Sequence, residues 1–147
     1  MDKPRVSAAP FQATLNTRYY IDYEWWERSN MDFNSQVARL CAEFDYELPQ
    51  DRDLDEMVDW VDPDTAEVKH VPLILYYVMQ HVAPNPDFIN QRISLIDGIF
   101  RALLEAGNYP MTPKELADRL NRDHRTILKT LSGSRIYQGI RPIQSEG

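Results

Sequence analysis

Cysteine and glycine are scarce in this sequence, and their scarcity excludes several kinds of fold and site. The 147 residues include one cysteine, Cys41, and five glycines. A lone cysteine cannot form an internal disulfide, so we expect Cys41 to be a small buried residue in a protein of the reducing cytoplasm. Five glycines leave little room for a phosphate-cradling loop, and neither a Walker-type P-loop nor an H-E-x-x-H zinc motif is present.

Long apolar runs are also missing. No stretch of 18 apolar residues occurs, and no apolar segment follows Lys3 and Arg5 near the N-terminus. We therefore expect no membrane partner, no membrane span and no secretory signal. The 43% of hydrophobic residues is still enough for a core, which excludes a wholly disordered chain.

The residues that could bind a metal or act as nucleophiles follow no established spacing. Asp51, Asp53 and Asp55 match the first positions of a calcium-loop template, but Glu56 stands where that template requires glycine. Cys41 and the three histidines lack the spacing of zinc ligands. We therefore expect no metal, no cofactor and no catalytic residues, and an enzyme is the least favoured of the functional alternatives.

Positive charge is in short supply except near the C-terminus. The net charge is −7, which is the wrong sign for a general nucleic-acid binder. Residues 1–110 contain 9 Lys and Arg against 19 Asp and Glu, whereas residues 111–147 contain 7 against 4. Because the acidic part repels nucleic acid at long range, only a locally basic face can approach it. The asymmetry therefore places a candidate interaction surface in the last quarter of the chain.

The N-terminal part is acidic and aromatic. We expect a flexible arm at 1–17 and a small acidic α+β domain at 18–86. Its predicted elements are, in order, a strand at 19–23, a helix at 32–45, a hairpin of strands 57–61 and 67–71 around an Asp62–Thr65 turn, and a buried helix at 72–82, for which a strand is the alternative. Five of the eight residues from Tyr19 to Trp26 are aromatic, which suits either a core or a partner interface.

The most specific pattern lies between residues 111 and 131. Thr112 is followed three residues later by Glu115, a spacing that predicts a capping box at the start of a helix. Asn121 falls where a turn of left-handed backbone is expected, and Asp123 suits the N-cap of a second helix over 123–132. The spacing of apolar and basic residues in this second helix predicts one buried face and one exposed basic face.

The pattern T-P-K-E-L-A-x-x-L-N-x-x-x-x-T-I-x-K-x-L resembles the helix-turn-helix of bacterial-type winged-helix proteins. The resemblance covers residues 88–143 and implies a first helix at 88–106 and a small wing at 134–143, with its turn at Gln138-Gly139. The expected fold is mainly α, of the α+β class, with a winged helix-turn-helix domain at 87–147. The sequence departs from the motif at Arg122, where a small aliphatic residue is usual.

The resemblance implies a cytoplasmic regulator of transcription that binds double-stranded DNA as a homodimer, with helix 123–132 as its recognition helix. Arg125 and Lys129 would contact guanine or phosphate, and His124 a base edge or phosphate. The full expected contact set is Thr112, Arg122, His124, Arg125, Thr126, Lys129, Arg135 and Arg141. The alternative is a protein–protein adaptor that docks a partner through the winged fold and Tyr19–Trp26, because one fold serves many roles.

Overall fold

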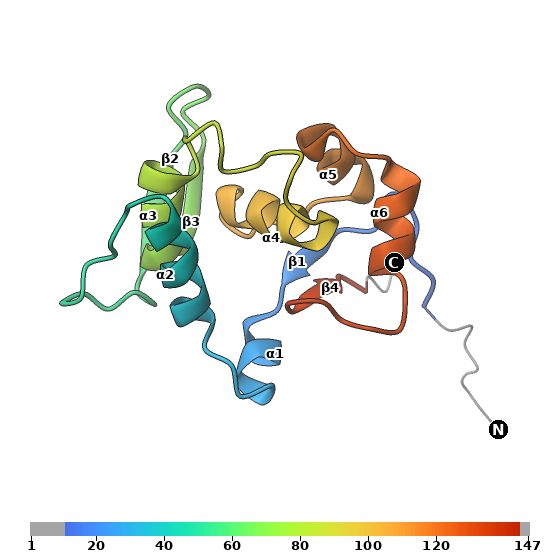
Figure 1. Ribbon diagram of the computed structural model, residues 1–147, viewed down its shortest axis with the longest axis horizontal. Helices are drawn as coiled ribbons and strands as arrows, with labels where there is room; N and C mark the ends of the chain where they lie inside the picture. Colours follow the sequence, from blue (N-terminus) through green and yellow to red (C-terminus); the bar gives the residue numbers. More distant parts are fainter. Residues whose placement is uncertain (1–10, 145–147) are drawn as a thin grey trace.

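The structure is a computed structural model, which describes residues 11–144. Its helices and short two-stranded sheets confirm the coarse α+β class. Figure 1 shows α4 near the centre, with α2, α3, β2 and β3 on one side and α5, α6, β1 and β4 on the other. Buried apolar side chains from both sides form one cluster, so the described part of the chain shares a single core.

The elements of the N-terminal half are β1 (Tyr19–Ile21), α1 (Tyr23–Arg28), α2 (Phe33–Glu43), β2 (Met57–Val61), β3 (Val68–Pro72), α3 (Leu73–Tyr77) and the π-helical turn η1 (Val78–Val82). The predicted helix and hairpin are confirmed by α2 and by the antiparallel β2–β3 pair. Asp62 stabilises the hairpin turn, because its carboxylate accepts hydrogen bonds from the amides of Asp64 and Thr65. Residues 73–82 are helical, so the strand alternative is wrong for them, and Pro72 is the last residue of β3.

The elements of the C-terminal half are α4 (Leu95–Glu105), α5 (Pro113–Leu120), α6 (His124–Leu131) and β4 (Ile140–Pro142). The predicted helix at 88–106 begins only at Leu95, because the Ser94 hydroxyl caps it by accepting from the Asp97 amide at 3.1 Å. Phe88 is fully buried without being helical, and its carbonyl accepts a 2.8 Å hydrogen bond from Arg101. Apolar periodicity before Leu95 therefore reflects burial of a loop rather than a helix.

The predicted junction between α5 and α6 is confirmed in detail. The Thr112 hydroxyl accepts from the Glu115 amide at 3.1 Å, and the Glu115 carboxylate accepts from the Thr112 amide at 2.9 Å. Asn121 adopts left-handed backbone with φ 55° and ψ 48°. The Asp123 carboxylate then caps α6 by accepting from the Arg125 amide at 3.1 Å. The three hydrogen bonds and the left-handed residue are all local in sequence, which is why residue spacing alone was sufficient to predict them.

The predicted wing at 134–143 is wrong in its pairing. Gln138 and Gly139 do form a turn with positive φ, but 134–137 is not a strand. Strand β4 pairs instead with β1, and Tyr19 of β1 also bridges Met111. The turn is held against α1, because Trp26 Nε1 donates to the Gln138 carbonyl at 3.0 Å.

Strand β1 therefore joins residues from the two ends of the described chain. It belongs to the range assigned to the acidic N-terminal domain, yet its sheet partner is the last strand. Asn108, which precedes α5, reinforces this arrangement: its side chain accepts from the Ile21 amide at 2.8 Å and donates to the Ile21 carbonyl at 2.9 Å. Residues 1–10 of the predicted flexible arm lie outside the described residues.

Candidate nucleic-acid interface

Helix α6 presents one buried face and one solvent face. Ile127 and Leu131 are buried, and successive helical residues are rotated by about 100°. Arg125, Thr126 and Lys129 therefore share the opposite side of the helix, where all three are exposed. Their guanidinium, hydroxyl and ammonium groups are donors of the kind that contact phosphates and base edges.

The solvent face of α6 is held by packing beneath it. The inner face of α5 consists of the buried residues Pro113, Leu116, Ala117 and Leu120. Gly98 on α4 allows close approach, since a Cβ atom there would lie 3.3 Å from a methyl group of Leu120. Gln91 completes the end of α5 by donating to the Leu120 carbonyl at 2.9 Å. Helix α6 lies at the outer right edge of the molecule in Figure 1.

No carboxylate in residues 11–144 lies within 4.0 Å of the charged group of Arg125 or Lys129. Asp123 is the nearest acidic residue in sequence, and its carboxylate is hydrogen-bonded to the backbone as the cap of α6. The two cations are therefore available to an external anion.

The other predicted contact residues differ from these two cations in burial and in their contacts. Thr112 and Arg122 are half-buried, and the Thr112 hydroxyl already serves as the cap of α5. His124 is also half-buried, three and seven residues before Ile127 and Leu131 and hence on the inner side of α6. Arg135 is exposed after α6, with its guanidinium 5.2 Å from the centre of the Tyr137 ring.

Two cations near α6 are engaged by carboxylates. Arg141 Nη1 lies 3.5 Å from Asp22 Oδ2, so this predicted phosphate contact is already paired. Arg119 on α5 makes a two-pronged contact with Glu105, with 2.9 Å between Arg119 Nη2 and Glu105 Oε1. The hydrogen bonds to Glu105 raise the pKa of Arg119 above its usual value. Sequence reasoning could not find these pairs, because their partners are distant in the chain.

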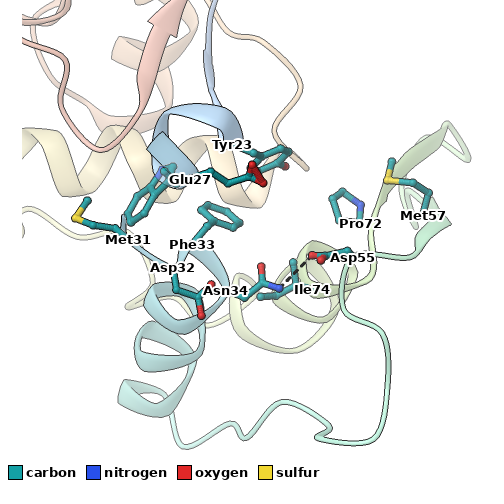
Figure 2. Close-up of a pocket in the computed structure, with 11 residues that line it drawn as sticks. Tyr23, Glu27, Met31, Asp32, Phe33, Asn34, Asp55, Met57, Pro72 and Ile74 are labelled. Atoms are coloured by element: carbon teal, nitrogen blue, oxygen red, sulfur yellow. Dashed lines mark hydrogen bonds between the residues drawn. The ribbon is translucent and has the colours of Figure 1, made fainter. Parts of the chain in front are cut away.

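A groove of about 340 Å³ lies on another part of the surface, between α1, the start of α2 and the ends of β2 and β3. Figure 2 shows side chains from these segments around a common space, with Asn34 hydrogen-bonded to Asp55. Tyr23, Trp26 and Phe33 supply aromatic surface, and burial raises the pKa of Tyr23. Its lining includes the carboxylates of Glu27, Asp32 and Asp55 and contains no described cation. The aromatic segment Tyr19–Trp26 was the only sequence signal for this groove.

The other residues that could act as nucleophiles or bind a metal do not lie together. Cys41 is buried, and burial raises the pKa of its thiol to about 11, so the thiol is protonated at neutral pH. His81 stacks on Tyr46 with 5.0 Å between ring centres, and His70 contacts Asp59 at 3.0 Å. Within the described range, no three residues among His, Cys, Asp and Glu gather in a way that could hold a metal ion.

None of the helices described between residues 11 and 144 is long and apolar enough to span a membrane. Comparisons with protein-family models, with curated proteins and with solved structures found no significant match to this chain.

Proposed function

We propose that this protein binds double-stranded DNA through the solvent face of α6 and regulates transcription, with α5 and α6 forming a winged-helix type of helix-turn-helix. The observation that carries the proposal is the placement of Arg125, Thr126 and Lys129 on one exposed face of a capped, well-supported helix. In such a motif the second helix enters the major groove while the first crosses the backbone.

Each exposed side chain has a distinct role in this proposal. Arg125 donates bidentate hydrogen bonds to guanine O6 and N7, and Lys129 reaches a guanine or a neighbouring phosphate. Arg122 before α6 and Arg135 after it lie near phosphates, where they position the helix without specifying sequence. The turn at Gln138-Gly139 makes no contact with a DNA groove in this proposal, because it is hydrogen-bonded to Trp26 of α1 and to Asp22, the N-cap of α1.

The charge distribution makes binding local and sensitive to salt. With a net charge of −7, the whole molecule gains no general attraction for DNA, so contact depends on the few cations around α6. Each phosphate that a cation neutralises adds about 0.9 to the slope of the logarithm of affinity against the logarithm of salt concentration. A homodimer would present two α6 faces, as a two-fold operator requires.

The test compares two sets of cations in one assay. Duplexes enriched from a random pool are titrated by fluorescence anisotropy at several salt concentrations. The Arg125→Ala/Lys129→Ala variant should lose about tenfold or more in affinity and about two units of salt slope. Arg119→Ala is the matched control, because it removes a nearby cation that is paired with Glu105. Unchanged binding in the double variant, or no duplex bound by the wild-type protein at low salt, overturns the proposal.

The groove favours a second candidate function, that of an adaptor. Its apolar lining and carboxylate rim suit a protein segment in which apolar residues alternate with Lys or Arg. The test is a pull-down with the wild-type protein and with Phe33→Ala/Asp55→Lys. A stoichiometric partner lost in the variant, together with no retention of the wild-type protein on DNA at moderate salt, would favour the adaptor over the DNA-binding function.

A further inference from the structure

The β2–β3 hairpin carries a regular pattern on its outer side. In the antiparallel register, cross-strand pairs alternate between the two faces of the ribbon. The inner pairs are Val58 with Val71 and Trp60 with Lys69. The outer ribbon face consists of three pairs: Met57 with Pro72, Asp59 with His70, and Val61 with Val68. Apolar pairs thus lie at both ends of this face, and one polar pair lies at its centre.

The apolar residues of the outer ribbon face are unusually exposed. Val61 and Val68 are 56% and 57% exposed, and Met57 is 48% exposed. Adjacent exposed apolar side chains on a two-stranded ribbon cost free energy in water and are typical of an interaction surface. The hairpin lies on the opposite side of the molecule from α6 (Figure 1), so α6 stays accessible when this face is covered.

We propose that the outer ribbon face is the interface of a two-fold symmetric dimer of this chain. The face is complementary to itself in the order of its apolar and polar pairs. Asp59 and His70 lie side by side at its centre, with 3.0 Å between Oδ1 and Nδ1. A two-fold axis that runs along the strands, midway between two facing ribbons, places β2 of one copy over β3 of the other.

This axis matches every pair on the face. The valine at 61 meets the valine at 68 of the second copy, and Met57 meets Pro72. Each Asp59 carboxylate then faces the His70 imidazole of the other copy as well as its own. A two-fold axis across the strands would instead set Asp59 against Asp59 and His70 against His70, which the charges disfavour. The face therefore selects one occupant, a second copy, and one orientation.

The dimer is expected to be weak. A ribbon of five residues per strand covers less than the roughly 800 Å² per partner of a standard stable interface. Tyr109 borders the face, because its hydroxyl accepts from the His70 amide at 3.0 Å, and it is itself exposed. Association should therefore depend on concentration over the micromolar range. The inference does not rest on DNA binding.

The first experiment measures self-association of the full chain by sedimentation velocity over a wide concentration range. The wild-type protein should dimerise reversibly, and Val61→Lys/Val68→Lys should weaken association by about tenfold or more. Ile143→Lys is the matched control, because Ile143 is an exposed apolar residue next to β4 and should leave association unchanged. A wild-type chain that stays monomeric, or a valine variant that still dimerises like wild type, overturns the inference.

A mixing experiment tests whether the polar pair of Asp59 and His70 lies at the two-fold interface. In the proposed dimer, Asp59→Lys alone removes the carboxylate that faces His70 of the second copy, and His70→Asp alone sets two carboxylates against each other. Each variant should therefore self-associate weakly. An equimolar mixture should recover association, because the introduced lysine of one variant then faces the introduced aspartate of the other. No recovery in the mixture contradicts a two-fold interface centred on this pair, provided that circular dichroism shows both variants folded.

Discussion

Arg125 and Lys129 on α6 carry the same charge as Arg119 and Arg141 nearby, but their surroundings differ. The first pair has no carboxylate within 4.0 Å among residues 11–144, whereas Arg119 contacts Glu105 and Arg141 contacts Asp22. Arg101 is a third paired cation, beside Glu43. The net charge of a segment therefore overstates the cations that it offers to a ligand. Tertiary contacts decide which of them are available.

The largest expected effect is on stability, at the most buried of the paired cations. The Arg101 side chain is only 12% exposed, donates to the Phe88 carbonyl at 2.8 Å and lies over two aromatic rings. Arg101→Ala should lower the free energy of unfolding by about 2 kcal/mol, because that carbonyl loses its partner. Urea denaturation measures this, and DNA affinity of the folded variant should stay as in wild type. A loss of DNA affinity without a loss of stability would show that Arg101 contacts DNA and is not simply a paired structural cation.

A smaller effect is expected when a paired cation is released. Glu105→Gln removes the charge that holds Arg119 on α5, next to α6. The freed guanidinium should reach a phosphate, raising DNA affinity by about threefold at low salt and increasing the salt slope by about 0.9. Glu43→Gln, which releases Arg101 on the other side of α4, is the control and should leave affinity unchanged. If Glu105→Gln also leaves both quantities unchanged, the position of α5 in the proposed complex is wrong.

The smallest effect is expected from Arg141→Ala. This cation lies in β4, paired with Asp22, and its predicted contact with phosphate does not fit that pairing. Duplex affinity should change by less than about twofold, because the guanidinium is already paired with Asp22 in a partly buried position. Anisotropy titrations at two salt concentrations would detect a larger loss, and such a loss would move Arg141 into the group of available cations.

The features predicted from the sequence are those whose partners are close in the chain. The capping box of Thr112 and Glu115, the left-handed Asn121 and the Asp62 turn each depend on hydrogen bonds that span a few residues. The strand partner of β4 and the contact that holds the Phe88 carbonyl depend on residues farther away in the chain, namely β1 and Arg101. Periodicity detects burial in such segments but does not identify the neighbour that causes it.

The candidate site divides in the same way. The solvent face of α6 followed from residue spacing, because Arg125 and Lys129 are four residues apart in one helix. The neutralisation of Arg141 did not, since Asp22 lies at the other end of the described chain. The groove in Figure 2 was missed for the same reason, as its lining comes from α1, α2 and the β2–β3 hairpin.

The pairing of β1 with β4 has a practical consequence for anyone who shortens this protein. A fragment that starts after residue 86 keeps α4, α5 and α6 but loses the strand that covers β4, together with Trp26, which packs on Gly139. The bare backbone of β4 would then be an open template for pairing with other molecules. Chimaeras and fusion proteins should therefore include both β1 and β4.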